Sequence, residues 1–163
     1  SNILIIDNGS VINSGPISDV VSDESLFDIS QHFEHFSLID AKVLEHDSDY
    51  DLTTVSVDEN VIQIPIVNAG IGSQIRLRIF SSDVALSIEK PHLISIRNII
   101  KCKILSIKES GKSFIYISLT LGNQEIASRI TRKSFEELKL STDSSVYILI
   151  KSAVIDKSKN SKL

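Results

Sequence analysis

An internal repeat constrains the fold of this 163-residue chain more than any other feature of its sequence. The stretch AKVLEHD, which begins at Ala41, matches CKILSIK, which begins at Cys102. Two further matches follow in the same order: TTVSVDENVIQIPI with SLTLGNQEIASRI, and IRLRIFSSDVAL with VYILIKSAVI. Segments that recur in this way indicate two copies of one small structural unit. The second copy is the longer one, because it carries an insertion around TRKSFEEL.

Each copy is predicted to consist of short β-strands. In FIYISLTL the apolar side chains alternate with more polar ones, and DEN and GNQ are typical of the turns that close hairpins. A unit of about 60 residues made of short strands cannot bury much surface alone. We therefore expect an all-β fold of two small five-stranded barrels of the oligonucleotide-binding (OB) type, packed side by side, in a protein that dimerises. The core face of that strand is predicted to carry Ile115, Ile117, Leu119 and Leu121.

The first 26 residues follow a different pattern. ILIIDNGSVINSGPISDVV predicts a strand, a turn at Asn8–Gly9, a second strand and a helix start after Gly15–Pro16. One short helix is expected in the second barrel, where Ser134 and Glu137 have the spacing of a capping box. The chain has no methionine, so we expect it to be a fragment of a longer protein. The predicted segments are a domain tail (1–26), a linker (27–37), a first barrel (38–92), a second barrel (93–156) and a flexible tail (157–163).

Charge is distributed unevenly along the chain. Residues 1–92 hold 4 Lys and Arg against 15 Asp and Glu, whereas residues 93–156 hold 10 against 6. The positive second half is therefore a candidate for binding an anion. A nucleic-acid partner is not predicted, because the first half is strongly acidic and the aromatic residues do not alternate with basic ones in the sequence.

The second copy resembles the Mop-type (TOBE, molybdenum-pterin-binding) domain. That family has a Ser-x-Arg-Asn motif, a Thr-x-x-Ser before a short helix, and a Lys-Ser in the last strand. The first copy resembles it less closely, since Phe80 stands opposite Lys151 and no full second anion motif is present. The whole chain is similar to the C-terminal portion of the ATP-binding subunit of bacterial molybdate importers, in which 1–26 would be the tail of an ABC-type ATPase domain. The matching motif residues are Ser95, Arg97 and Asn98; Thr131 and Ser134; Lys151 and Ser152.

This resemblance implies a regulatory domain that binds molybdate or tungstate and adjusts import by an ABC transporter. The alternative is a structural dimerisation module of the same ATPase with a vestigial anion site. Both imply a homodimer, a transmembrane permease as partner, and a peripheral location on the cytoplasmic face of the bacterial inner membrane. The resemblance also implies that the SIRN motif of one barrel meets Thr131, Ser134 and Lys151 of another barrel. The implied oxyanion-binding residues are Ser95, Arg97, Thr131, Ser134 and Lys151.

The chemistry of this residue set fits a fully ionised oxyanion. Molybdate carries no proton at neutral pH, so a good site offers only donors such as guanidinium, ammonium, hydroxyl and backbone N–H groups. The set contains no carboxylate, which disfavours hydrogen phosphate because its proton would require an acceptor. Sulfate fits the same donors, and the sequence does not set the cavity size that would separate it from molybdate or tungstate.

Other candidate sites are weaker. DSDYD, from Asp47 to Asp51, has Leu52 where a calcium loop needs glycine, so a solvated hairpin turn is favoured. The four histidines are not arranged as metal ligands, and Cys102 is expected to be a small buried residue. No G-x-x-x-x-G-K-[ST] loop occurs, so the fragment is not expected to be an enzyme, and it needs no cofactor. ATP and magnesium would bind only in the ATPase domain of the parent chain.

Overall fold

The computed structural model describes residues 2–7, 10–16 and 35–156. The chain divides into two units, Ser1–His35 and Phe36–Leu163. In the first unit, β1 (Asn2–Asp7) and β2 (Ser10–Pro16) pair antiparallel, as the sequence predicts for two strands joined by a short turn. The predicted turn at Asn8–Gly9 and the helix predicted after Pro16 lie outside the described residues.

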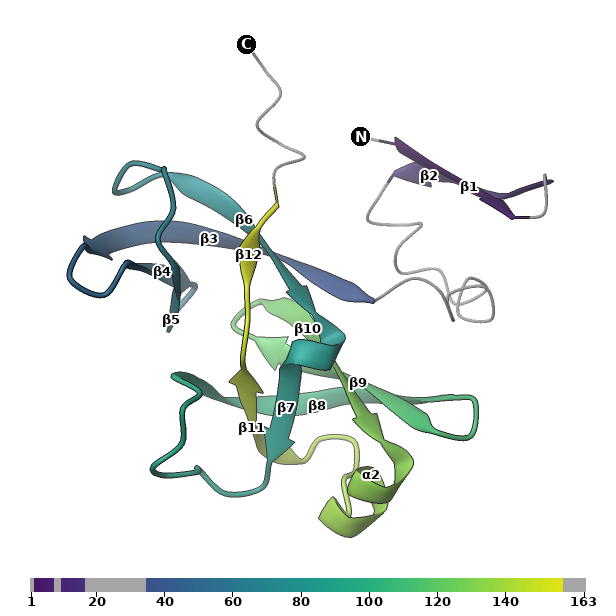
Figure 1. Cartoon of the computed structure of the whole chain (residues 1–163). Coiled ribbons are helices and arrows are strands. Elements are labelled where there is room, and N and C mark those ends of the chain that lie inside the picture. The colour runs from purple at the N-terminus through teal and green to yellow at the C-terminus, as the bar shows by residue number, and fades with distance from the viewer. Residues whose placement is uncertain (1, 8–9, 17–34, 157–163) are drawn as a thin grey trace. The chain divides into compact units, whose positions relative to one another are not determined.

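The second unit is almost entirely β-structure and contains both sequence repeats, so the predicted fold class is confirmed (Figure 1). Its two five-stranded sheets have the orders β12-β6-β3-β4-β5 and β10-β9-β8-β11-β7. The first repeat supplies β3 (Phe36–Asp47), β4 (Leu52–Val57), β5 (Asn60–Pro65), β6 (Gln74–Phe80), a 3-10 turn η3 (Ser81–Asp83) and β7 (Val84–Ser87). The second repeat supplies β8 (Asn98–Ser110), β9 (Phe114–Leu121), β10 (Gln124–Thr131), α2 (Arg132–Leu138), β11 (Ser145–Ile150) and β12 (Val154–Ile155).

The two repeats exchange their last strands. Strand β7 follows β6 in the sequence but pairs antiparallel with β11 of the second repeat. Strand β12 follows β11 but pairs antiparallel with β6 of the first repeat. The division at residues 92 and 93 therefore separates the sequence copies, whereas both hydrogen-bonded sheets cross it. The predicted segment boundaries therefore remain a prediction.

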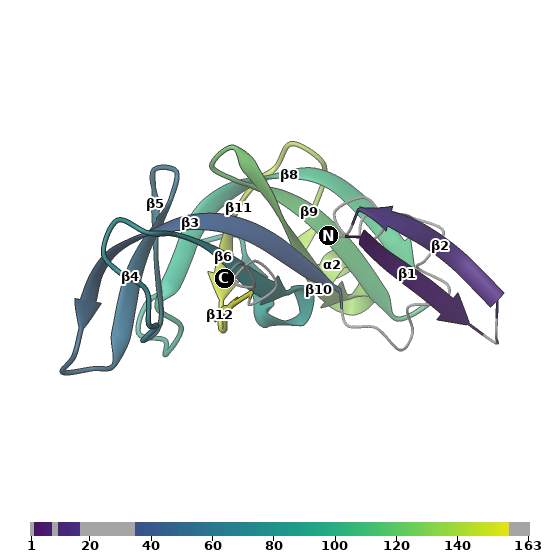
Figure 2. The same cartoon turned by 90° about the horizontal axis from the view of Figure 1, so that it is seen from above.

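The sequence repeat is also a structural repeat. The β3–β6 register places Ala41 opposite Ile75, and the β8–β11 register places Cys102 opposite Val146. The two pairs are equivalent, because Ala41 aligns with Cys102 and Ile75 with Val146. In each repeat the register of the first hairpin shifts at the same aligned position, between Val43 and Glu45 in β3 and between Ile104 and Ser106 in β8. Such bulges bend a strand, and Figure 2 shows both β3 and β8 as curved strands.

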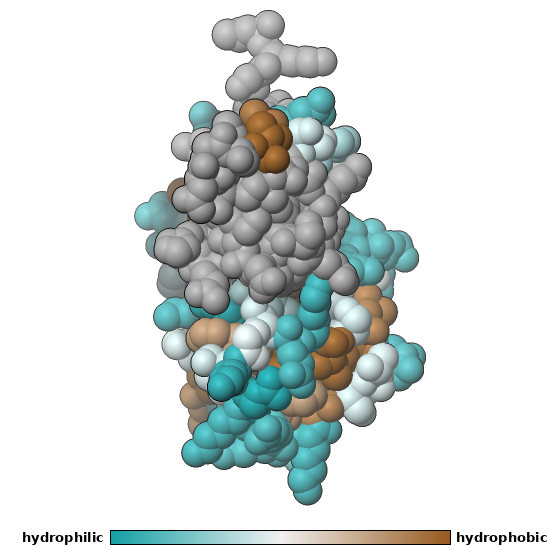
Figure 3. Space-filling model, turned by 90° about the vertical axis from the view of Figure 1, so that its right-hand side faces the viewer, coloured by the Kyte–Doolittle hydropathy of each residue, from teal (hydrophilic) through white to brown (hydrophobic). Residues whose placement is uncertain are grey.

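One hydrophobic core extends through both repeats. The predicted inward face of β9 is confirmed, since Ile115, Ile117, Leu119 and Leu121 are fully buried. Burying a branched apolar side chain of this size contributes about 1.5–3 kcal/mol. Cys102 is buried as predicted, and burial raises the pKa of its thiol to about 12 because the thiolate would lose its hydration. On the face that Figure 3 shows, apolar areas lie among hydrophilic side chains.

The helix of the second repeat begins earlier than predicted. Its N-cap is Thr131, whose backbone is extended and whose hydroxyl oxygen accepts the N–H of Ser134 at 3.1 Å. Ser134 is thus the third residue of α2, and the predicted cap at Ser134 is wrong. The reason is that Thr131 ends a strand and can satisfy a free amide of the first turn at the same time.

The DSDYD segment forms a hairpin turn between β3 and β4, as predicted. The carboxylate of Asp47 accepts the backbone N–H groups of Asp49 at 3.1 Å and Tyr50 at 3.2 Å. Among the residues that the structure describes, no three His, Cys, Asp or Glu side chains are grouped so that they could hold a metal ion. In the same residues, no helix has the length and apolar character needed to cross a bilayer.

Candidate anion-binding site

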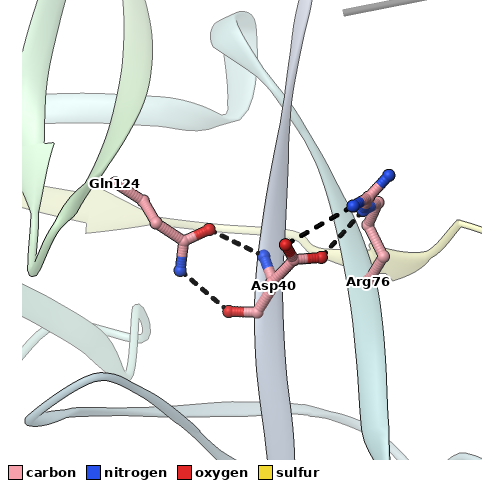
Figure 4. A network of polar contacts seen from close by, with 3 residues as sticks. All are labelled: Asp40, Arg76 and Gln124. Atoms are coloured by element: carbon pink, nitrogen blue, oxygen red, sulfur yellow. Dashed lines mark hydrogen bonds and ion pairs between the residues drawn. The ribbon is translucent and has the colours of Figure 1, made fainter.

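The site depends on how the two repeats are joined, and Figure 4 shows one of these contacts. The backbone N–H of Asp40 donates to the Gln124 side chain at 2.8 Å, and the Gln124 amide donates to the Asp40 carbonyl at 2.9 Å. The Asp40 carboxylate meanwhile pairs with Arg76 at 2.8 Å, which raises the pKa of that guanidinium. Side-chain amides thus join the repeats through backbone groups, and the charges of this contact are already paired.

The SIRN motif of the second repeat is docked on β5, an edge strand of the first sheet. The Asn98 side-chain oxygen accepts the N–H of Gln63 at 2.8 Å, and its amide donates to the Gln63 carbonyl at 2.8 Å. The side-chain amide of Asn98 therefore pairs with both backbone groups of an edge residue, as a neighbouring strand would. The first repeat does the same in a simpler form, because the hydroxyl of Ser37, which aligns with Asn98, accepts the N–H of Ala127 at 2.9 Å.

Arg97 is held by the same residue of β5. Its Nε donates to the side-chain oxygen of Gln63 at 2.7 Å, and the arginine is solvent-exposed. In the described part of the chain, the terminal Nη groups of Arg97 have no hydrogen-bond or ion-pair partner. The guanidinium is therefore anchored at one edge by a neutral group, and its terminal nitrogens remain free to bind a ligand.

Lys151 lies beside Arg97 in the same chain. The antiparallel β8–β11 register ends with Asn98 opposite Ile150. Arg97 precedes Asn98 and Lys151 follows Ile150, so the two residues come next at the same end of the strand pair. The backbone of Lys151 is fixed by a 2.9 Å hydrogen bond from its N–H to the carbonyl of Asp83. Strand pairing thus makes the backbones of Arg97 and Lys151 neighbours within one chain, which favours a shared site in that chain over the expected meeting of the SIRN motif with Lys151 of another barrel.

The first repeat has an aromatic pair in place of these two cations. Phe36 and Phe80 align with Arg97 and Lys151, and they face each other across β3 and β6. Their ring centres lie 6.1 Å apart in an edge-to-face arrangement. The nearby Arg78 lies over the Phe36 ring, and its guanidinium pairs at 2.7 Å with Asp156. The cation pair is thus specific to the second repeat, and the Phe36–Phe80 register shows that residues at these positions are neighbours.

Thr131 and Ser134 form a second group. Their hydroxyl oxygens lie 2.9 Å apart at the start of α2. Thr131 pairs with Phe114, which in turn pairs with Ser110 at the end of β8, whereas Arg97 precedes the start of β8. In the described residues, no hydrogen bond or ion pair joins this group to Arg97 or Lys151. Figure 1 likewise shows α2 at the far end of β10, away from the connection between β11 and β12.

The five predicted residues are therefore arranged as two groups and one separate residue. Arg97 and Lys151 form one group, Thr131 and Ser134 form the other, and Ser95 lies exposed in the segment before β8. Sequence reasoning missed Gln63, which contacts both Arg97 and Asn98. No signal in the sequence would have found it, because Gln63 aligns with Ala127 in the second repeat and belongs to no motif.

Comparison with known proteins assigns the second repeat. Its residues 94–155 match the TOBE domain family. Residues 94–155 are a TOBE domain. This TOBE domain covers β8 to β12 and thus contains all five predicted site residues, whereas Gln63 and strand β7 lie outside it.

Relatives that match nearly the whole chain are named as molybdenum import ATP-binding proteins. The chain is 34% identical over 158 residues to "Molybdenum import ATP-binding protein ModC" of Hahella chejuensis, covering 96% of this chain and 44% of that protein. It is 32% identical over 155 residues to "Molybdenum import ATP-binding protein ModC 2" of Azotobacter vinelandii, covering 94% and 43%. The chain resembles the Mop-type region of these ATP-binding proteins and spans less than half of their length.

A solved structure shares the fold of the TOBE domain and its partner repeat. The molybdate-bound form of ModG, described as a cytoplasmic molybdate-binding protein, superposes with a TM-score of 0.61 at 18% identity. The match covers 73% of this chain and 94% of that one. Both repeats, and not the TOBE domain alone, therefore belong to a known architecture.

Proposed function

We propose that this chain is the oxyanion-sensing region of a molybdate-import ATPase and that Arg97 and Lys151 bind the anion. One observation carries the proposal: three of the other four arginines are neutralised by a carboxylate and the fourth, Arg129, lies over the Phe114 ring, whereas the tip of Arg97 has no partner among the described residues. Arg76, Arg78 and Arg132 each pair with a carboxylate, at 2.8, 2.7 and 2.9 Å. Arg97 donates only to a neutral amide, and Lys151 has no ion-pair partner among the described residues. Two adjacent uncompensated cations favour a dianion as ligand.

The hydroxyl group at the start of α2 would complete the site from a second copy of the chain. Within one chain, Thr131 and Ser134 lie at the opposite end of the second sheet from Arg97 and Lys151. A two-fold homodimer would bring the hydroxyls of one copy to the cations of the other and would form two equivalent sites. Molybdate, tungstate and sulfate have only acceptor oxygens, which suits this set of donors.

In a transporter, such a site would report the supply of anion. Binding at the junction of two copies would favour one arrangement of the ATPase dimer and thereby lower import when molybdate is abundant. The partner would be the transmembrane permease, and the protein would lie peripherally on the cytoplasmic face of the inner membrane. The names of the relatives support an ABC-type parent ATPase. The competing hypothesis is a structural dimerisation module that binds no anion.

Equilibrium dialysis of the chain against molybdate tests the proposal. Molybdate or tungstate should bind and raise the melting temperature, and phosphate at the same concentration should not, because a ligand bound only by the folded state stabilises it. Arg97→Ala and Lys151→Ala should each abolish measurable binding, since each removes a charge-assisted contact worth about 1.5–3 kcal/mol. Lys101→Ala is the matched control, because Lys101 is an exposed lysine on β8 and should leave binding unchanged. Binding of phosphate as strong as that of molybdate would contradict the donor-only site.

Mixed dimers test which residues act together. A heterodimer of Arg97→Ala with Thr131→Ala should regain one site per dimer, since the intact Arg97 of one chain would face the intact Thr131 of the other. A heterodimer of Arg97→Ala with Lys151→Ala should regain none, because both cations of a site come from the same chain. Differentially tagged chains can be mixed, purified and titrated with molybdate. Recovery in the second mixture but not in the first would refute this assignment of residues to chains.

A further inference from the structure

Gln63 is fixed in position more firmly than an ordinary exposed-strand glutamine. Its backbone N–H and carbonyl are both bonded to the side chain of Asn98, at 2.8 Å each, and Asn98 is buried. Its side chain is half-buried and accepts the Nε hydrogen of Arg97 at 2.7 Å. Asn98 and Arg97 are consecutive, so one residue of the first repeat holds two neighbouring residues of the SIRN motif.

This contact determines which edge of the Arg97 guanidinium can reach a ligand. A guanidinium offers one pair of donors along the Nε side and another pair at its tip. Gln63 occupies Nε, so only the tip, formed by the two Nη groups, remains available for a two-point contact. We propose that Gln63 is a positioning residue of the anion site, which presents Arg97 end-on to the oxyanion. This inference rests on the proposed function, and it makes the first repeat, outside the TOBE domain, part of the site.

The neutrality of Gln63 is as important as its position. A carboxylate at this place would accept from Arg97 at least as well, as the carboxylates beside Arg76 and Arg132 do. It would also cancel the positive charge of Arg97 and repel a dianion. A neutral amide orients the guanidinium and leaves its charge available. A purely structural role and a positioning role therefore predict opposite effects for Gln63→Glu.

Two variants of the full chain separate these roles. Gln63→Met keeps the length of the side chain but removes the acceptor, so Arg97 must be ordered when the anion binds. We expect molybdate affinity to fall about threefold to tenfold, the range for ordering one long side chain. Gln63→Glu keeps the acceptor and adds a negative charge, so affinity should fall about tenfold or more while the melting temperature without ligand stays unchanged or rises. Gln74→Glu adds the same charge at an exposed position on β6 and should bind like wild type.

The measurement is the dissociation constant for molybdate by equilibrium dialysis, with the ligand-free melting temperature of each variant. The ranking wild type, then Gln63→Met, then Gln63→Glu, with Gln74→Glu equal to wild type, supports the inference. If Gln63→Glu does not fold, the Met variant alone decides. Wild-type affinity in either folded Gln63 variant, while Arg97→Ala abolishes binding, would overturn the role of Gln63 and leave the proposed function intact. Failure of the wild-type chain to bind molybdate at all would overturn the proposed function and this inference with it.

Discussion

The meeting point of two hairpin turns gives the sharpest test of how the repeats are joined. Gly122 lies in the turn between β9 and β10 with φ of +60°, and Asp58 lies at the aligned position between β4 and β5. The Asp58 carboxylate accepts the N–H of Asn123 at 2.7 Å. A Cβ added to Gly122 would lie 2.2 Å from that carboxylate oxygen and 2.7 Å from the Asp58 Cβ. Gly122→Ala must therefore displace Asp58 and break its hydrogen bond.

The expected loss of stability has two parts. A residue with a Cβ in the left-handed region costs about 1 kcal/mol relative to glycine. Losing the hydrogen bond between Asp58 and Asn123 adds about 0.5–1.5 kcal/mol, at the modest end because Asp58 is exposed. The free energy of unfolding should thus fall by about 2 kcal/mol. For a chain of this size, that corresponds to a drop of about 4–8 °C in melting temperature.

The chain provides its own control for the backbone part. Gly111, in the turn between β8 and β9, also has φ of +60°, and nothing lies within 4 Å of the Cβ that alanine would add. Gly111→Ala should therefore cost only about 1 kcal/mol. In an Asp58→Gly background, which removes both the carboxylate and the Cβ that the new methyl group would meet, Gly122→Ala should cost the same as Gly111→Ala, and urea denaturation of the four variants would measure this coupling. Equal losses for Gly122→Ala and Gly111→Ala in the wild-type background would refute the close contact between the turns.

Two further predictions concern buried groups. Asn98→Ala should lower the free energy of unfolding by about 2–3 kcal/mol in urea denaturation, because it leaves the N–H and carbonyl of Gln63 without partners. Asn98→Asp should keep only the acceptor for the Gln63 N–H and should therefore recover part of this loss. Cys102 should resist a thiol reagent at pH 9, since burial raises its pKa to about 12, and it should react at once in denaturant; rapid labelling of the folded chain would contradict the burial of this residue.

The sequence predicted those features that depend on local pattern. The alternation in FIYISLTL identified the buried face of β9, and the internal alignment identified the equivalent positions of the two copies, Ala41 with Cys102 and Ile75 with Val146, which occupy the same places in the two registers. These predictions succeeded because strand periodicity and repetition are written in neighbouring residues.

Features that depend on distant partners were not predictable in the same way. Strands β7 and β12 have only four and two residues, too few to show a periodicity, and their partners lie in the other repeat. The pairing of Arg97 with Lys151 in one chain followed from the register of β8 and β11, which residue spacing does not reveal. The start of α2 at Arg132 was missed because two residues with capping side chains, Thr131 and Ser134, stand within one helical turn.

The exchange of strands has a consequence for the TOBE domain as a unit. A fragment of residues 94–156 would keep β11 but lose β7, its partner over four residue pairs, and it would keep β12 without the β6 strand that receives it. It would also lose Gln63, leaving the Asn98 amide without the backbone groups that it bonds. Without β7, the edge of β11 would expose backbone hydrogen-bonding groups and core side chains to water. We therefore expect this fragment to lack a cooperative thermal transition as a monomer, and to fold only if a second copy supplies the missing strand. Restoring residues 36–93 should recover both the transition and molybdate binding. A monomeric 94–156 fragment that melts within a few degrees of the full chain would show that the exchanged strands do not stabilise the domain.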